Sequence, residues 1–254
     1  MADYQKILYA VENHIARITL NRPDKRNALD SEIVNEIKAA LTEAANDEAV
    51  RVVVISGAGK DFCSGADLAA LQKISEATVM ENVEDARNLA ELFIAMRRHP
   101  RPIVASVRGR ALAGGCGIAT ACDIVLANES AQFGYPEVNI GFIPAMVMAI
   151  LKRSVSEKRA FELITRGEII SARTACDYGI INRVFADDEF DARVEEYLTT
   201  FTTKSASAVS LSKNLLYHMD AMTFETAIEA GVQLNAITRM TEDCKRGVER
   251  FLKK

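Results

Sequence analysis

Three short, largely apolar runs constrain the fold of this chain most strongly. They are Val52–Ile55, Ile103–Val107 and Asp123–Ala127, and each is rich in β-branched residues. Strands buried on both faces read as continuous apolar runs, as in a parallel sheet covered by helices. Helix-like stretches separate these runs, and strand–helix–strand connections of this kind form right-handed crossovers. The pattern therefore predicts an α/β core.

Helical spacing and capping residues mark the segments between the strands. Asp30 or Ser31 can cap a helix in which apolar residues recur every three or four positions. A long helical stretch runs from about Thr78 to Arg98 before two prolines, and a short helix follows at Gly114–Ala121. After Pro144 nearly everything reads as helix, apart from a short strand near residues 181–185. We therefore expect an α/β core followed by a helical C-terminal region.

Composition excludes several classes of protein. The chain has 254 residues, of which 49% are hydrophobic and 26% charged, values typical of a globular protein. Its net charge is −4 and no tract is strongly basic, so we expect no nucleic-acid partner. The longest apolar stretch, around residues 140–151, is shorter than the roughly 20 residues that cross a bilayer, so we expect no membrane partner.

The cysteines and histidines suggest neither disulfides nor a metal site. The five cysteines form no C-x-x-C pair, and the three histidines lack metal-ligand spacing. The first residues show no charged leader followed by an apolar core. We expect reduced thiols, a cytoplasmic protein and no bound metal.

Two segments combine small residues with the start of a helix. They are Phe62–Leu68 and Ala111–Gly117. The N–H groups at a helix N-terminus lack intrahelical partners and carry partial positive charge. Two such groups that converge on one oxygen form an oxyanion hole. The alternative is that these glycines only allow close helix–strand packing. Neither segment fits a phosphate-binding loop or a dinucleotide fingerprint.

Glu137 is the candidate acid/base. It lies within Phe133–Val138, among apolar and aromatic neighbours. Desolvation there would raise its pKa toward the range useful for a general base. The alternative is a glutamate in a surface turn.

Taken in order, these motifs resemble the enoyl-CoA hydratase/isomerase (crotonase) family over nearly the whole chain. The matching segments are Asn21–Pro23, Asn27–Leu29, Phe62–Leu68, Gly109–Asp123, Phe133–Gly141, Ile143–Pro144, Ile170–Ala172 with Ala175 and Gly179, and Gly247–Val248 with Phe251–Leu252. The resemblance implies a crotonase-like spiral of β-β-α units over residues 1–190. It also implies a helical oligomerisation region over residues 191–254, a homotrimer or homohexamer, and a place in fatty acid metabolism.

The resemblance also implies a chemistry. The family binds acyl-CoA thioesters and stabilises an enolate-like intermediate at the thioester oxygen. By motif position, the N–H groups of Ala66 and Gly114 would form the oxyanion hole, and Glu137 would be the acid/base. No cofactor is expected, since CoA enters as part of the substrate. Lys25, Arg26 and Ala28 are placed where family members contact the nucleotide end of CoA, and Lys254 aligns with a C-terminal lysine that reaches a neighbour's 3′-phosphate.

One departure from the family pattern bears on the reaction. Family hydratases use two glutamates, and the position of the first is Gly117 here. Hydration of a 2-enoyl-CoA is the expected activity. Double-bond isomerisation is the alternative that Gly117 favours, because Glu137 alone could move one proton between two carbons. A non-catalytic acyl-CoA-binding protein and another reaction of the family are further alternatives. The acidic residues from Glu76 to Glu91 could supply a second carboxylate, or they could form a solvated helix face.

A second departure follows Pro144. Many family members have a glycine-rich helix start there, whereas this chain has Ala145–Ile150. Either these larger side chains reshape the acyl pocket or they form a core helix face.

Overall fold

The computed structural model describes residues 4–253, apart from the side chains of residues 68 and 71. The strands are β1 (Ile7–Glu12), β2 (Ile15–Leu20), β3 (Val52–Gly57), β4 (Ile103–Val107), β5 (Arg110–Leu112), β6 (Ile124–Asn128), β7 (Gln132–Gly134), β8 (Ile169–Ser171) and β9 (Arg183–Phe185). The helices are η1 (Pro23–Lys25), α1 (Ser31–Asn46), α2 (Leu68–Glu76), α3 (Val79–Arg98), α4 (Gly114–Ala121), η2 (Pro136–Ile140), α5 (Ala145–Ser154), α6 (Glu157–Arg166), α7 (Ala172–Tyr178), α8 (Phe190–Thr202), α9 (Ala206–His218), η3 (Met219–Ala221), α10 (Phe224–Arg239) and α11 (Glu242–Leu252).

The three apolar runs form the centre of the larger sheet, as predicted. This six-stranded sheet has the order β1-β2-β3-β4-β6-β9. Only the β1–β2 pair is antiparallel, and all its other pairs are parallel. A second sheet of three short strands has the order β5-β7-β8.

Alternate residues of β3 face two separate hydrophobic layers. Val53 and Ile55 belong to the main core, which also contains the apolar residues of α1, α3 and α4. Val52 and Val54 face the opposite way and pack with residues of α8, including Phe190. Both faces of the central strands are therefore covered by helices, which explains their continuous apolar sequence.

The cap predicted at Asp30 or Ser31 is present, and α3 also carries a cap that was not predicted. The Asp30 side chain accepts a hydrogen bond from the N–H of Ile33 at 3.0 Å. Thr78 and Glu81 form a capping box at the start of α3. Each cap satisfies N–H groups that have no partner within the helix.

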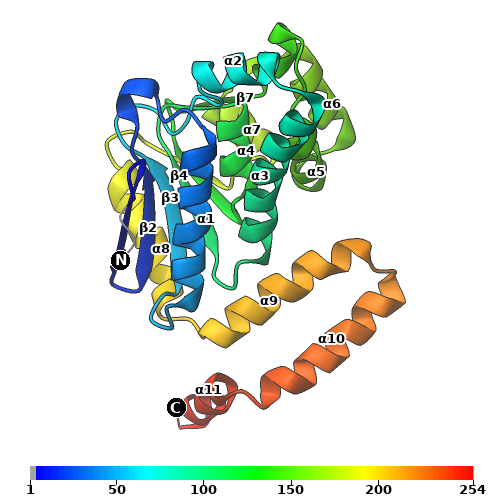
Figure 1. The fold of residues 1–254 in the computed structure, drawn as a ribbon. Helices are drawn as coiled ribbons and strands as arrows, with labels where there is room; N and C mark the ends of the chain where they lie inside the picture. Colours follow the sequence, from blue (N-terminus) through cyan, green and yellow to red (C-terminus); the bar gives the residue numbers. More distant parts are fainter. Residues whose placement is uncertain (1–3, 254) are drawn as a thin grey trace.

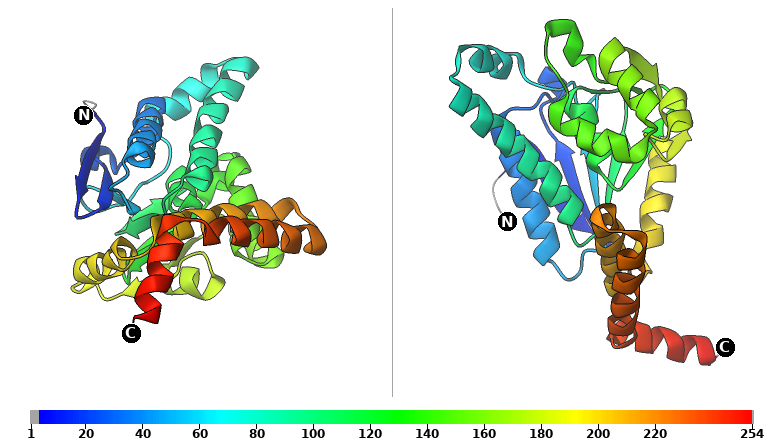
Figure 2. Two further views of the ribbon diagram at one scale, coloured as in Figure 1. Left: turned by 90° about the horizontal axis from the view of Figure 1, so that it is seen from below. Right: turned by 90° about the vertical axis from the view of Figure 1, so that its right-hand side faces the viewer.

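Helices α9, α10 and α11, with the short η3 between α9 and α10, form an arm that extends away from the core (Figures 1 and 2). No residue of α10 or α11 is buried in this single chain. The arm exposes large apolar side chains, namely Leu216, Phe224, Ile228, Val232, Ile237, Met240, Val248, Phe251 and Leu252. Burial of such side chains is the main favourable term in association, so the arm has the composition of a surface that another protein covers.

Candidate active site

Strand β5 lies between two parallel neighbours, the segment at Cys63 and strand β7. On one side Cys63 forms a parallel bridge with Ala111, and the N–H of Leu112 donates to the Cys63 carbonyl at 3.0 Å. On the other side β5 pairs in parallel with β7, where Leu112 lies opposite Gly134. Their carboxyl ends therefore meet at one edge.

Each of these segments leads, three residues further along the chain, to a predicted site residue. The residues are Ala66 after Cys63, Gly114 after Ala111 and Glu137 after Gly134. The topology thus delivers three groups from distant parts of the sequence to one place, at the carboxyl ends of parallel strands, where α/β proteins bind ligands.

The N–H group of Ala66 points away from its neighbouring strand. The N–H of Leu29 donates to Gly65 at 2.7 Å, and the carbonyl of Leu29 accepts from Asp67 at 2.8 Å. Because Leu29 bonds to the residues on either side of Ala66, the Ala66 N–H faces the other way. Within residues 4–253 no protein acceptor bonds to it. This amide is available to a ligand.

Gly114 is the first residue of α4, so its N–H has no partner inside the helix. The preceding residue, Ala113, has φ +50° and ψ −127°, a conformation that costs about 1–3 kcal/mol in a residue with a side chain. The N–H of Ala113 donates to the Gly134 carbonyl at 2.9 Å, which helps to hold this turn. The strained turn fixes the direction of the Gly114 amide.

Gly65 brings these two amides close together. It has φ +96°, and a Cβ atom at this position would lie 2.8 Å from the Cβ of Ala113 and 3.7 Å from the N atom of Gly114. Only glycine allows both this backbone conformation and this approach. The structure therefore brings together the segments that carry Ala66 and Gly114.

The Glu137 side chain is buried in η2. The residue is 9% exposed, and its Oε2 atom has no hydrogen-bond partner among the described residues. Burial raises the pKa of this carboxyl above its usual range. A buried carboxyl oxygen without a partner requires an explanation, and a proton-transfer role supplies one. The acidic residues of the α2–α3 region, Glu76, Glu81, Glu84 and Glu91, are exposed, and the last three line a large cavity.

The space beside Gly117 is filled by apolar side chains. A Cβ atom at Gly117 would lie 2.7 Å from Cγ2 of Val147 and 3.2 Å from Cζ of Phe93. Val147 comes from the segment that departs from the family pattern after Pro144, so the two departures are in contact. Phe93 was not predicted, because one aromatic residue in a long helix carries no sequence signal.

An ion pair beneath Ala66 was also missed by sequence reasoning. Arg22 donates through Nη2 to Oδ2 of Asp67 at 2.6 Å, and through Nη1 to the carbonyl of Ala28 at 2.6 Å. Asp67 also caps α2 by accepting from the N–H of Ala69 at 2.9 Å. The pair fixes the residue that follows Ala66. Arg22 belongs to the Asn21–Pro23 turn that the sequence singled out, but spacing alone does not reveal that its partner lies 45 residues away.

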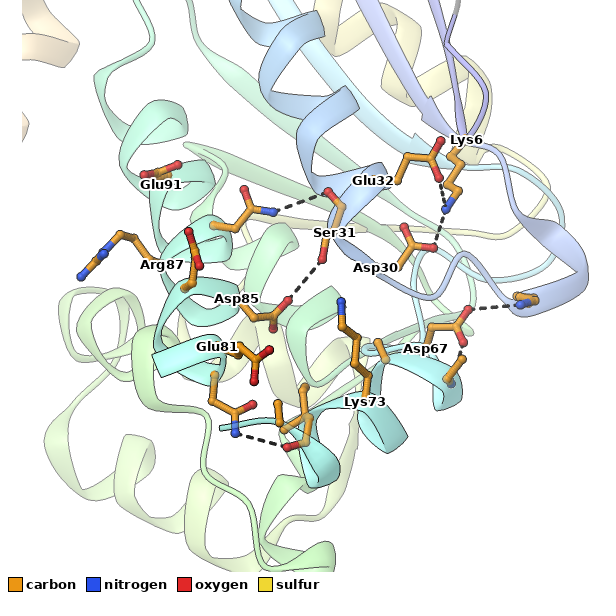
Figure 3. A pocket seen from close by; sticks show the side chains of 18 of the residues that line it. Lys6, Asp30, Ser31, Glu32, Asp67, Lys73, Glu81, Asp85, Arg87 and Glu91 are labelled. Carbon is orange, nitrogen blue, oxygen red and sulfur yellow. Dashed lines mark hydrogen bonds and ion pairs between the residues drawn. The ribbon is translucent and has the colours of Figure 1, made fainter. Parts of the chain in front are cut away.

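One of the predicted CoA-contacting residues, Lys25, lies at a cavity of about 920 Å³ that is lined by both acidic and basic side chains. Lys25 lines this cavity, and its Nζ lies 3.4 Å from Oδ2 of Asp67. Lys73 of α2 points into the same cavity (Figure 3), a residue that sequence reasoning missed. Arg26 adopts a left-handed conformation with φ +52°, and Ala28 is 6% exposed. Lys254 lies outside the described residues.

No helix within residues 4–253 is both long and apolar enough to cross a bilayer. The same range contains no cluster of three or more His, Cys, Asp or Glu side chains arranged to hold a metal ion.

Comparison with known proteins places this geometry in context. The profile of the enoyl-CoA hydratase/isomerase family matches residues 10–254. A Thermus thermophilus protein named as an enoyl-CoA hydratase is 37% identical over 243 residues, which are 96% of each chain. The crotonyl-CoA hydratase of Syntrophomonas wolfei is 32% identical over 99% of this chain and 96% of its own.

A solved structure supports the fold assignment. The enoyl-CoA hydratase of Mycobacterium smegmatis superimposes with a TM-score of 0.93 and 31% identity, covering 98% of this chain and 96% of that chain. This likeness confirms the crotonase-like fold expected from the sequence.

Proposed function

Because the chain belongs to the enoyl-CoA hydratase/isomerase family, we propose that it hydrates a 2-enoyl-CoA thioester through an oxyanion-stabilised enolate. The observation that supports the proposal is the close approach of Gly65 to Ala113 and Gly114, at the strand edge from which the chain leads to Glu137. Both amides lack acceptors among the described residues, and Glu137 has a buried oxygen without a partner.

In the proposed reaction the thioester oxygen accepts hydrogen bonds from the N–H groups of Ala66 and Gly114. As water adds to the β-carbon, negative charge moves onto this oxygen and both hydrogen bonds strengthen. The hole therefore stabilises the transition state more than the ground state. Glu137 accepts one proton from the water while the hydroxyl bonds to the β-carbon, and it returns that proton to the α-carbon. All atoms of water appear in the product.

Double-bond isomerisation is the second candidate, favoured by the apolar surroundings of Gly117. Glu137 would remove a proton from the α-carbon of a 3-enoyl-CoA and return it at the γ-carbon. The same hole would hold the dienolate oxygen. This reaction needs one carboxylate and no water.

Neither reaction requires a metal or redox cofactor, since CoA arrives with the substrate. Lys25, Arg26 and Ala28 would contact its nucleotide end, with Lys254 of a neighbouring copy at the 3′-phosphate. Lys73 adds a further positive charge to the cavity that Lys25 lines. A cytoplasmic location fits the five cysteines, all of them free thiols.

Assembly into a homotrimer or homohexamer would cover the apolar arm. Phe224 is 76% exposed and Phe251 80% exposed in the single chain, which supports burial against other copies. Light scattering of the purified protein should give the mass of three or six chains. A monomer at micromolar concentration would contradict the assembly.

The experiment that tests the function compares two substrates. Crotonyl-CoA hydration and 3-enoyl-CoA isomerisation are measured for the native protein and for Glu137→Gln. Hydration of crotonyl-CoA by the native protein and its loss in Glu137→Gln support the proposal. Isomerisation of the 3-enoyl-CoA without hydration, lost in the same variant, supports the second candidate instead. Binding of acyl-CoA without turnover of either substrate identifies a non-catalytic binding protein instead.

A further inference from the structure

The side chains of Val147 and Phe93 pack against Gly117 and form an apolar wall there. Val147 lies on α5 and is 3% exposed, while Phe93 lies on α3 and is 7% exposed. A Cβ atom on Gly117 would come within 2.7 Å of Val147 and 3.2 Å of Phe93. These contacts leave no space for a larger side chain at position 117 unless Val147 moves.

This apolar wall borders the space where the reacting carbons would lie. Gly117 follows Gly114 by three positions on α4, so both lie on one face of the helix, about 5–6 Å apart. The adjacent residue, Cys116, lies close enough to Glu137 for the carboxylate charge to help raise the pKa of its thiol to about 12, although burial is the larger cause. Position 117, which Val147 and Phe93 contact, therefore lies one helical turn from the predicted hole donor Gly114 and next to a residue close to Glu137.

The side chains beside Gly117 offer no polar group to a water, and the backbone groups of Gly117 are already hydrogen-bonded. The N–H of Gly117 donates to the carbonyl of Ala113 at 2.9 Å. The carbonyl of Gly117 accepts from Oγ1 of Thr120 at 3.2 Å. The side chains of Val147 and Phe93 offer only carbon atoms. An ordered water needs about two to four polar partners, and these two side chains supply none.

We propose that Val147, supported by Phe93, is a specificity-determining residue that limits water addition relative to proton return. This inference rests on the proposed enolate chemistry and concerns how the enolate or dienolate forms and decays. In hydration, water supplies a hydroxyl to the β-carbon and a proton to the α-carbon. In isomerisation, the proton removed from the α-carbon returns at the γ-carbon and nothing is added. A wall without polar groups disfavours only the first reaction.

The test places a polar group on the wall without changing its shape much. Val147→Thr replaces one methyl group by a hydroxyl, and Val147→Ala makes room for water. Val155→Thr is the matched control, since Val155 is also buried in the main core but follows the C-terminal end of α5, eight positions after Val147. For each variant, the ratio of kcat/KM for crotonyl-CoA hydration to kcat/KM for 3-enoyl-CoA isomerisation is measured. Thermal unfolding identifies variants that have not folded.

The inference predicts that this ratio rises about tenfold in Val147→Thr, the effect of one added hydrogen bond to water. A smaller rise is expected in Val147→Ala and none in Val155→Thr. If Val147→Thr does not fold, Val147→Ala decides the matter. An unchanged ratio in a folded Val147 variant, or an equal rise in Val155→Thr, would overturn the inference. Inactivity of the native protein toward both thioesters would instead contradict the proposed function.

Discussion

Arg22 Nη2 lies 2.6 Å from Asp67 Oδ2, and the two side chains are only 13% and 6% exposed. The pair joins the loop before α1 to the residue that follows Ala66. The pKa of the Asp67 carboxyl lies below its usual value. The largest cause is the hydrogen bond from the N–H of Ala69, and the next is the hydrogen bond from Arg22. This nearly buried ion pair holds the backbone at Asp67, next to the Ala66 amide.

Arg22→Met is expected to lower kcat about 10–100-fold, because Asp67 would lose its buried partner and the Ala66 amide would lose its support. Steady-state kinetics on crotonyl-CoA measure this effect. Lys25→Met is the control, since its ion pair with Asp67 is longer, at 3.4 Å, and Lys25 is mostly exposed. It should affect KM more than kcat. An Arg22→Met enzyme with native kcat would show that the ion pair does not position the amide.

Glu137→Gln should lose activity and gain stability at neutral pH. Loss of a general acid/base lowers kcat about 10²–10⁴-fold. Burial raises the pKa of Glu137 in the folded state, so the folded protein binds this proton more tightly than the unfolded chain. The stability that this group contributes is complete below its unfolded pKa and is lost as the pH rises through its folded pKa.

Thermal unfolding across pH measures the stability effect of this substitution. The native Tm should fall relative to that of Glu137→Gln as the pH rises through the folded pKa of Glu137. The quantity compared is the Tm of Glu137→Gln minus the native Tm. A smaller value of this difference at pH 7 than at pH 4 would contradict the burial argument.

Gly65→Ala should impair the candidate oxyanion hole. The new Cβ atom would lie 2.8 Å from the Cβ of Ala113 and so push the two amide-bearing segments apart. We expect kcat to fall about 10²–10³-fold, as after loss of one hole donor. Gly141→Ala is the matched control, because Gly141 also has a positive φ, +75°, but has no atom within 4 Å of the new Cβ. Equal losses of kcat in both variants would trace the effect to backbone strain alone.

Lys213→Met should loosen the attachment of the arm. Lys213 Nζ lies 2.7 Å from Oδ2 of Asp123 and donates to the carbonyls of Met96 and Arg101 at 3.1 Å. Removing one member of a buried pair leaves an uncompensated charge and costs about 3–5 kcal/mol of unfolding free energy. Urea titration measures this loss. Lys245→Met breaks an exposed pair with Glu242 and should change stability by less than about 1 kcal/mol.

Long apolar runs and caps could be predicted from the sequence, because each depends on local periodicity. The predicted helix at Gly114–Ala121 matches α4, and the run at Val52–Ile55 lies within β3. The strands β5, β7 and β8 were not predicted. Each has three residues, and such short segments form only because neighbouring strands hydrogen-bond to them.

The predicted site residues were found by motif, whereas their surroundings required the three-dimensional structure. The resemblance to the family indicates Ala66, Gly114 and Glu137 by motif position, but it does not indicate that Arg22 pairs with Asp67. The same limit applies to Gly117, because sequence shows a missing glutamate and not the Val147 side chain that fills its space. Contacts between residues far apart in the chain leave no local pattern. The division of the chain at residue 190 stays a prediction.

The most direct test of the account is a crystal structure of the Glu137→Gln variant with a bound 2-enoyl-CoA. The account predicts that the thioester oxygen lies about 2.7–3.1 Å from the N atoms of both Ala66 and Gly114. It also predicts that the side chain at position 137 lies within hydrogen-bond reach of a water or an acyl carbon at the reacting end. A thioester oxygen bound away from both amides, with residue 137 facing solvent, would contradict it.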